Sequence, residues 1–553
     1  MSRKHFEFWP RHLARNITAP STNLFYNAEV SAARFPDKPL MNFYGTELTY
    51  GEFHAQAERL AGYLEHQCGV KKGDRVLLVM QNSPQFIVSY YAVLRANAIV
   101  VPVSPMSVTA ELEHYLHDSG ARIALVAQEI FPQLRPLVGT TVDHAIVAAY
   151  SDYVTHPTDL RIPEAVAAPR EKIEDRNVTL WADALAQKLL PGPLTMGPDD
   201  LCVIPYSSGT TGRPKGCMLS HANVMHTLLV NRAWFSATPD STQLVVLPFF
   251  HVTSMQGGMN GPIFQGSTII LMSRWDRETA AELIQRYEPM SWTAIATMVI
   301  DFLANPRLPD YDLSSLVQVS GGGAAMPAAV GERLQQLIGS GYIEGYGLTE
   351  TIAPTHINPP DRPKRQCLGI PVCNTDSRIV DPETLQELPP NQVGEIVTHG
   401  PQVFQGYWRN EAATRDAFIE IDGRKFFRTG DLGYVDDEGY FFLVDRLKRM
   451  INASGFKVWP AEIEAQMYQH PAIQEACVIA TRDAHRGETV KALVVLRSTH
   501  RGSVSEEEII EWTRQNMATY KHPRIVQFVD ALPKSATGKV QWRLLQEAEM
   551  AHA

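Results

Sequence analysis

Cysteine is scarce in this chain, with six residues among 553. The six are Cys68, Cys202, Cys217, Cys367, Cys373 and Cys477. No two of them form a C-x-x-C pair, and none stand at the spacing of a zinc site. This scarcity excludes a small disulfide-stapled scaffold. It favours reduced thiols in a cytoplasmic protein.

Excess positive charge and long apolar runs are also missing. The formal net charge is −10, which gives no electrostatic footprint for nucleic acid, so any phosphate site must be made locally positive. The most apolar stretch near the start, residues 86–103, is broken by Arg95 and Asn97 and is a poor membrane span. No apolar segment of a secretory signal opens the chain.

The first fifteen residues are basic and aromatic, a composition that allows peripheral contact with an anionic membrane surface. Pro10 interrupts any helix there, which favours a plain N-terminal arm.

A length of 553 residues predicts two or more domains. Helical patterns at residues 50–67, 84–97 and 110–117 alternate with strand-like runs at 75–80, 98–103 and 123–126. This alternation predicts parallel sheets covered by helices. The Pro-rich, charged stretch 156–177 predicts an irregular surface excursion.

The pattern changes after Arg446. It predicts a helix over 461–469, strands over 476–480 and 490–496, and a helix over 506–517. These elements make an α+β unit of about a hundred residues, a common domain size. We therefore expect an N-terminal domain of residues 1–447 and a C-terminal domain of residues 448–553.

The segment Tyr206–Gly216, YSSGTTGRPKG, follows a short apolar run. Its glycines let the backbone approach a ligand, its hydroxyls and N–H groups can bind an anion, and Lys215 adds a positive charge. The predicted phosphate-binding residues are Ser207, Ser208, Gly209, Thr210, Thr211, Gly212 and Lys215. The segment is not the common P-loop, because no GxxxxGK[ST] fits it. The alternative is a flexible Ser/Gly surface loop.

Five further segments carry chemistry-bearing residues: SGGGAA (320–325), EGYGLTE (344–350), FRTGD (427–431), DRLKRMINASG (445–455) and PKSATGK (533–539). Taken singly, these segments also read as glycine turns, turn aspartates or exposed loop charges.

In this order and spacing, the segments resemble the adenylate-forming (ANL) superfamily, which includes acyl- and aryl-CoA synthetases, firefly luciferase and peptide-synthetase adenylation domains. The resemblance covers nearly the whole chain. It implies an α/β fold, with a large N-terminal domain of layered sheets flanked by helices, a distorted β-barrel part, and a small mobile α+β C-terminal domain. It also implies use of ATP, Mg²⁺ and CoA.

The resemblance assigns roles around the nucleotide. Tyr346, flanked by Gly345 and Gly347, matches the residue that stacks on adenine. Thr349 matches the residue that bonds the α-phosphate, and Glu350 matches the Mg²⁺ ligand. Gly322, Gly323 and Ala324 match the segment along adenine and the acyl pocket.

The resemblance also assigns roles later in the chain. Asp431 and Arg446 match the groups that hold the ribose, and Lys539 matches the catalytic lysine. Lys448 matches the hinge about which the small domain rotates. Gly455, with Asn452 and Lys457 nearby, then enters on the thioester-forming face.

The acid is predicted from the segment PFFHVTS, residues 248–254, which resembles the family's acyl-pocket segment. His251 would lie near the thioester channel as a catalytic residue, or would be a satisfied buried histidine. Gly257 and Gly258 supply no bulk, and no Lys or Arg occurs between Val245 and Ser273. These features favour a medium- or long-chain fatty acid, as in bacterial fatty-acid–CoA ligases. The family often has Pro in the stretch matching Ala296–Val299, where this chain reads ATMV, which leaves chain length open.

Other functions stay open. One is an aryl-acid CoA ligase, and another is an adenylating enzyme that loads a carrier protein. A nucleotide-binding regulator without catalytic activity is disfavoured by the presence of Lys539, Glu350 and Asp431. Luciferase-like oxygenases share these motifs, so a side activity of that kind also stays open. The predicted partners are small molecules, with a homodimer left open.

Overall fold

The computed structural model describes residues 4–207, 214–323, 326–453, 456–483, 487–518, 521–534 and 540–552. The chain divides into two compact units. The large unit comprises Met1–Ser377, Thr398–Phe427 and Glu438–Tyr440, and the small unit comprises Arg378–Val397, Arg428–Asp437 and Phe441–Ala553. The expected domain boundary at residue 447 stays a prediction. Among the described residues, none of the helices has the length and apolar character needed to cross a membrane.

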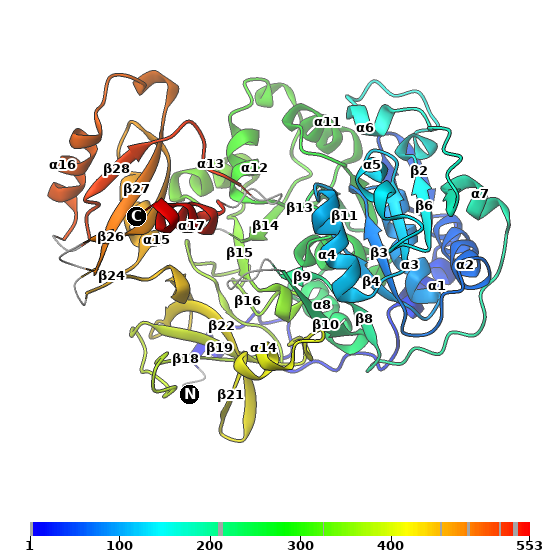
Figure 1. Cartoon of the computed structure of the whole chain (residues 1–553), viewed down its shortest axis with the longest axis horizontal. Helices are drawn as coiled ribbons and strands as arrows, with labels where there is room; N and C mark the ends of the chain where they lie inside the picture. Colours follow the sequence, from blue (N-terminus) through cyan, green and yellow to red (C-terminus); the bar gives the residue numbers. More distant parts are fainter. Residues whose placement is uncertain are drawn as a thin grey trace. The chain divides into compact units, whose positions relative to one another are not determined.

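The described part of the large unit contains a first nine-stranded sheet, in the order β17-β16-β15-β14-β13-β11-β12-β1-β2. Strands β11 and β13 to β16 of this sheet are labelled in Figure 1. Its strands are β1 (Pro39–Phe43), β2 (Thr46–Thr49), β11 (Thr242–Val245), β12 (Thr268–Leu271), β13 (Ser291–Thr293), β14 (Gln318–Gly322), β15 (Ile343–Tyr346), β16 (His356–Ile357) and β17 (Ile370–Pro371). The strands from β1 to β15 in this order run parallel, and both edges are antiparallel.

A second sheet follows the order β20-β10-β8-β4-β3-β5-β6-β7, with β9 paired to β10. Its strands are β3 (Arg75–Val79), β4 (Ile99–Pro102), β5 (Ile123–Ala127), β6 (His144–Ala148), β7 (Val178–Leu180), β8 (Leu201–Val203), β9 (Tyr206–Ser207), β10 (Lys215–Ser220) and β20 (Gly406–Tyr407). The strands β8, β4, β3, β5, β6 and β7 are parallel. Buried parallel sheets of this kind are covered by helices on their faces.

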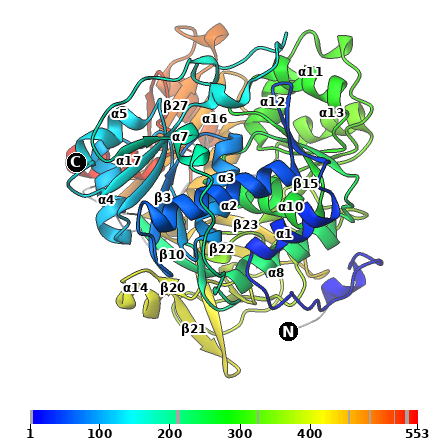
Figure 2. The ribbon, with the colours of Figure 1, turned by 90° about the vertical axis from the view of Figure 1, so that its right-hand side faces the viewer.

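The helices of the large unit are α1 (Phe25–Arg34), α2 (Tyr50–His66), α3 (Pro84–Arg95), α4 (Thr109–Ser119), α5 (Phe131–Leu134), α6 (Glu164–Ala167), α7 (Trp181–Ala186), α8 (His221–Trp234), α9 (Val252–Ser254), α10 (Gly261–Gln265), α11 (Arg277–Tyr287), α12 (Ala296–Leu303), α13 (Ala328–Ile338) and α14 (Glu411–Asp416). Helices α2 and α3 lie side by side (Figure 2). Helix α2 begins at a capping box, because Thr49 and Glu52 each bind the other's backbone N–H. A π-helix, η4 (Met255–Asn260), stands between α9 and α10.

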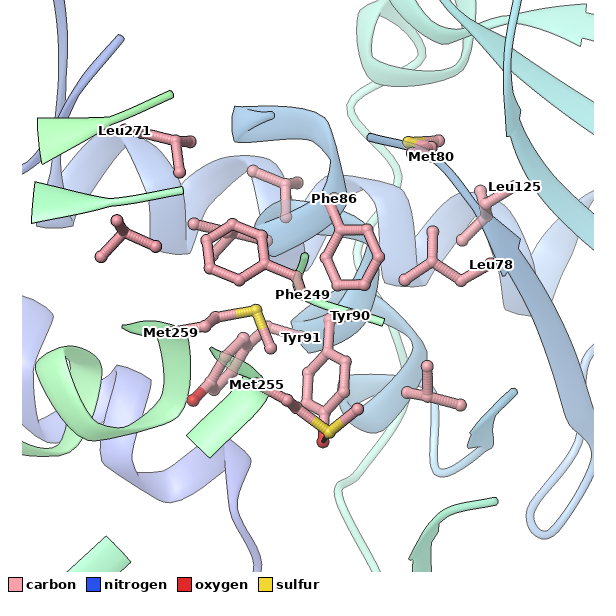
Figure 3. Packing of buried hydrophobic residues seen from close by; sticks show 14 of the residues in the cluster. Leu78, Met80, Phe86, Tyr90, Tyr91, Leu125, Phe249, Met255, Met259 and Leu271 are labelled. Atoms are coloured by element: carbon pink, nitrogen blue, oxygen red, sulfur yellow. Dashed lines mark hydrogen bonds between the residues drawn. The ribbon is translucent and has the colours of Figure 1, made fainter. Parts of the chain in front are cut away.

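The core of the large unit joins α3 to the segment that follows β11. The ring of Phe86 lies 5.5 Å from that of Phe249, and Tyr90 and Tyr91 point toward Met255 and Met259 (Figure 3). All residues of α3 except Arg95 are buried, as expected for a helix that is mostly apolar. This packing fixes the segment in which the acyl pocket was predicted.

A third sheet has the order β18-β19-β22-β21, with β23 paired to β22. Its strands are β18 (Asp376–Val380), β19 (Gly394–His399), β21 (Phe418–Ile421), β22 (Arg424–Val435) and β23 (Phe441–Arg446), and the division into units falls within β18, β19 and β22. The small unit also holds a sheet of β24 (Ile451–Ala453), β25 (Phe456–Val458), β26 (Ile473–Asp483), β27 (Gly487–Leu496) and β28 (Ile525–Phe528), with α15 (Pro460–Met467), α16 (Glu506–Asn516) and α17 (Trp542–His552). It has its own core around Ile463, Val478 and Val494.

The predicted alternation of helices and strands is confirmed from α2 through β5, and so is the layered α/β class. The α+β pattern after Arg446 is confirmed by β26, β27, α15 and α16. The stretch 156–177 contains only the single-turn helix α6 in its described structure.

The N-terminal arm packs on the large unit. Trp9 is buried, and its ring meets that of Trp234 edge-on at 5.2 Å. The Ile17 N–H donates to Asn374 Oδ1 at 2.9 Å. The arm therefore uses its aromatic residues for intramolecular packing.

Candidate active site

The predicted phosphate loop is framed by two paired strands. Strands β9 and β10 are antiparallel, and Ser207 stands opposite Lys215. A Cβ atom on Gly216 would lie 2.7 Å from Ile204 Cγ2, so this position needs glycine for close packing. The loop residues between the strands, including Ser208, Gly209, Thr210, Thr211 and Gly212, lie outside the described residues.

A buried carboxylate lies beside this frame. Glu350 is 8% exposed, and the hydroxyl of Tyr407 donates to its Oε1 at 2.9 Å. The ammonium of Lys215 lies 4.9 Å from the centre of the same tyrosine ring. Burial, followed by the charge of Glu350, raises the pKa of the Tyr407 phenol and keeps it a donor. Tyr407 thus contacts both the predicted metal ligand and the predicted phosphate-binding lysine, and no sequence motif singles this tyrosine out.

The backbone that presents Glu350 is strained. The short helix η6 (Thr349–Thr351) is followed by Ile352 at φ 45° and Ala353 at φ 29°. A positive φ is rare for a β-branched residue such as Ile352, and such strain is concentrated at functional sites. A Cβ atom on Gly347 would lie 2.8 Å from Ala353 Cα, which explains that glycine. Thr349 itself is half-buried.

Strand packing accounts for the glycines near the predicted adenine site. In the parallel pair β14–β15, Gly322 stands opposite Gly345, and a Cβ atom on Gly322 would lie 2.3 Å from the Gly345 oxygen. Gly323 adopts φ +86°, which favours glycine. The ring of Tyr346 lies 5.6 Å from that of His356. Ala324 lies outside the described residues, and the adenine-binding roles stay predictions.

Glu344 was given no role by sequence reasoning, yet it ties the two segments of this site together. It is 7% exposed, and its Oε1 accepts a hydrogen bond from the Met326 N–H at 3.1 Å. Burial raises the pKa of this carboxyl to about 7, although backbone N–H groups oppose the shift. Glu344 therefore holds the backbone at Met326 against β15.

His251 is half-buried at the start of α9, and its Nδ1 accepts from the Thr253 N–H at 3.4 Å. This contact gives it a local capping role, and the predicted catalytic role stays a prediction. The two nearby glycines differ. A Cβ atom on Gly257 would meet nothing within 4 Å, whereas one on Gly258 would lie 2.9 Å from Val245 Cγ1. Of the pair, only Gly257 faces open space.

In the small unit, the structure brings Asp431 and Arg446 together. They stand opposite each other in the β22–β23 pair, and Arg446 Nε lies 3.2 Å from Asp431 Oδ1. Asp431 is only 3% exposed. A buried carboxylate beside a guanidinium can accept hydrogen bonds from a pair of hydroxyls, as the predicted ribose role requires.

The turn that carries Asp431 is held by Glu395, a residue that no sequence motif singles out. Glu395 is 1% exposed and accepts from Arg428 Nη2 at 2.6 Å and from the Gly430 N–H at 3.1 Å. Gly430 adopts φ +69°. A buried ion pair therefore shapes the predicted ribose-binding turn.

The predicted hinge residue Lys448 lies in the 3₁₀ helix η7 (Leu447–Arg449). On either side of it, Asp445 Oδ2 accepts from the Ala461 N–H at 2.7 Å, and Arg449 pairs with Glu464 of α15. Burial raises the pKa of Asp445, and Arg449 opposes that shift. Lys539 and Gly455 lie outside the described residues, as do the side chains of Lys448, Asn452 and Lys457.

A family model described as AMP-binding enzyme matches residues 28–408, and one described as AMP-binding enzyme C-terminal domain matches residues 462–539. The chain belongs to the AMP-binding enzyme family. The resemblance to adenylate-forming enzymes is thereby confirmed.

Curated relatives of this AMP-binding enzyme include the long-chain-fatty-acid–CoA ligase of Bacillus subtilis (strain 168), 35% identical over 98% of this chain and 97% of the relative. A feruloyl-CoA synthase from Amycolatopsis is 33% identical over 90% of this chain and 93% of the relative. Among solved structures, an ATP-bound RpMatB-BxBclM chimera matches with a TM-score of 0.83 and 29% identity, over 96% of this chain and 99% of the other. Mycobacterium tuberculosis fatty acyl CoA synthetase matches with a TM-score of 0.72 and 28% identity, over the same shares.

Proposed function

We propose that this AMP-binding enzyme activates a medium- or long-chain fatty acid with ATP and transfers the acyl group to CoA. A carboxylate oxygen attacks the α-phosphorus, the bond to pyrophosphate breaks, and an acyl-adenylate forms. The CoA thiolate then attacks the acyl carbon, and AMP leaves. The single observation that carries the proposal is the Lys215–Tyr407–Glu350 cluster beside the glycine-rich loop. Relatives named long-chain-fatty-acid–CoA ligases support the choice of acid.

Glu350 suits a magnesium ion, because hard carboxylate oxygens are the ligands that this cation prefers and Tyr407 orients one of them. When bound, Mg²⁺ neutralises charge on the phosphates. Lys215 and the loop hydroxyls would hold the phosphates, and Asp431 and Arg446 would hold the ribose. Lys539 would stabilise the charge that develops at the α-phosphate, before rotation at Lys448 brings the Gly455 face in for thioester formation.

The open space at Gly257 supports an acyl substrate, since a chain of methylenes needs room. An aryl acid is the second candidate, because a feruloyl-CoA synthase is among the relatives. We also expect a cytoplasmic location, and a homodimer and a peripheral membrane contact are further parts of the proposal.

The test is a substrate panel. Pyrophosphate release and thioester formation are measured with fatty acids from about C4 to C18 and with aryl acids, with and without CoA, and compared as kcat/KM. We expect acyl-CoA from fatty acids at the highest kcat/KM. Preference for aryl acids, or thioester formation only with a phosphopantetheinylated carrier protein, would contradict the proposal.

A further inference from the structure

The π-helix η4 lies shortly after His251 and places its two adjacent glycines in different surroundings. Its wide turn is marked by the Gly261 N–H, which donates to the oxygen of Gln256, five residues earlier. Gly257 faces open space in this turn, and Gly258 faces Val245 in the core. Single π turns inside helices occur often at functional sites.

A chain of buried polar side chains holds this turn. The Tyr91 hydroxyl donates to Asn260 Oδ1 at 3.0 Å, and Asn260 Nδ2 donates to Gln256 Oε1 at 3.0 Å. Gln256 Nε2 in turn donates to the oxygen of Val224 at 3.0 Å and to the hydroxyl of Thr227. Tyr91, Asn260 and Gln256 are almost fully buried. Figure 3 shows Tyr91 pointing from α3 toward this segment.

A cation holds the same turn from α8. Arg232 Nη2 donates to the Gly257 oxygen at 3.3 Å. Burial lowers the pKa of this guanidinium to about 10, so it stays charged at neutral pH. Gly261 fits against it, because a Cβ atom there would lie 3.0 Å from Arg232 Nε.

Apolar side chains would fill this core without the cost of burying polar groups. A buried hydrogen-bond network whose donors and acceptors are all paired instead selects one backbone arrangement among several that would pack equally well. In an ordinary α-helix successive residues turn by about 100°, so loss of the π turn would rotate the residues before it relative to those after it and change what Gly257 faces. The network thus holds the π turn in which Gly257 faces the open space.

We infer that Asn260 is a positioning residue for acyl-chain selection, which acts by locking the π turn that presents Gly257 to the substrate. The inference rests on the proposed function. It names a determinant of chain length that makes no contact with ATP in the proposed scheme.

The experiment compares Asn260→Leu and Tyr91→Phe with a matched control. Tyr50→Phe also removes a buried tyrosine hydroxyl, which donates to the oxygens of Pro262 and Ser267 outside the π turn. The full-length variants are assayed for acyl-CoA formation with acids from about C4 to C18, and the KM for ATP is measured in parallel. We expect the ratio of long-chain to short-chain kcat/KM to change by about tenfold in Asn260→Leu and Tyr91→Phe, as for misplacing one or two methylenes. The KM for ATP should stay unchanged.

A uniform loss on all acids, equal to that of Tyr50→Phe at matched folded fraction, would overturn the inference. If Asn260→Leu does not fold, Gly257→Val decides, because it changes the open space directly and should lower activity on long acids more than on short ones. An unaltered chain-length profile in Gly257→Val would overturn the inference as well. If the wild-type protein forms no acyl-CoA from any acid, the proposed function itself fails.

Discussion

Glu350 shows how single residues make this site. Its carboxylate is almost fully removed from water, and a hydroxyl donor fixes one oxygen. Burying a carboxylate is costly unless partners stabilise its charge. The Tyr407 hydroxyl and the strained backbone at Ile352 hold this group in place, and a bound divalent cation would stabilise its charge further.

Replacing Glu350 with Gln keeps the shape and removes the charge. We expect pyrophosphate release to slow by about a hundredfold or more, as for loss of one charge-stabilising group. The Mg²⁺ concentration for half-maximal rate should rise, and circular dichroism should be unchanged. Tyr407→Phe is the matched control, since it removes a donor and keeps the carboxylate. An identical Mg²⁺ titration in Glu350→Gln would exclude this residue from the metal site.

Glu344 makes the stability of the protein depend on pH. Its pKa rises from 4.5 to about 7 on folding, so between these values the folded protein holds a proton that the unfolded chain has lost. Unfolding then releases a proton, and the free energy of unfolding falls as pH rises through this window. The full effect, reached above pH 7, is roughly 3 kcal/mol by the usual conversion.

Glu344→Gln should abolish this contribution and keep an acceptor for the Met326 N–H. Relative to the wild type, the variant should gain about 1–3 kcal/mol in free energy of unfolding between pH 5 and pH 8. Urea denaturation at several pH values measures the difference. A difference that does not vary with pH would show that Glu344 titrates normally.

At the scale of elements, the π-helix η4 corrects one expectation. The sequence suggested that Gly257 and Gly258 both keep the acyl pocket open, because a glycine pair looks the same at both positions. The π turn instead sends one position toward open space and the other into the core. A π turn has no distinctive sequence pattern, so side-chain periodicity alone does not reveal it.

The two glycines therefore make a matched pair. Gly257→Leu should lower kcat/KM for acids of about C12 to C18 by at least tenfold and spare acids of about C4 to C6. Gly258→Leu should destabilise the protein by about 1–3 kcal/mol through overpacking against Val245 and affect all acids alike. Thermal melting measures the stability of both variants, and kcat/KM across the panel of acids measures their chain-length preference. The opposite assignment of the two phenotypes would mean that Gly258 lines the pocket.

The N-terminal arm is a second element whose role the composition did not settle. Trp9→Ala should cost about 3 kcal/mol of stability, because a buried indole that packs on Trp234 is removed. Arg11→Ala, at an exposed position of the same arm, should have no measurable effect. Differential scanning calorimetry measures both. Unchanged melting of Trp9→Ala would show that the arm is not docked in solution.

At the scale of the whole molecule, the sequence predicts what is local. Helix α2 with its capping box, the strands around α3 and the ordered motifs could all be read from residues near one another in the chain. Glu344, Glu395 and Tyr407 could not. Each acts through a partner far away in sequence, as when Tyr407 meets Glu350, and only the tertiary fold brings such pairs together.

The two-step scheme makes a prediction for the entire chain. Lys539→Ala should slow acyl-adenylate formation by about a hundredfold or more. Thioester formation from supplied acyl-adenylate should survive, because in the proposed scheme Lys539 would act only before the small domain rotates. Single-turnover assays of the two half-reactions separate these effects. Equal losses in both would contradict rotation at Lys448.

The cysteines give this enzyme built-in reporters of local opening. Five of them are buried, and only Cys68 is partly accessible. Cys217 lies in β10 beside the Lys215 cluster, and burial raises its pKa, whereas Cys477 lies in the core of the small unit. A buried thiol reacts with a soluble reagent only when its surroundings open, so its labelling rate measures that opening. Labelling of Cys217 and Cys477, measured by mass spectrometry, would therefore follow local opening in the two units separately, without an engineered probe. A slower labelling of Cys217 in the presence of ATP would show how far the bound nucleotide suppresses local opening around β10.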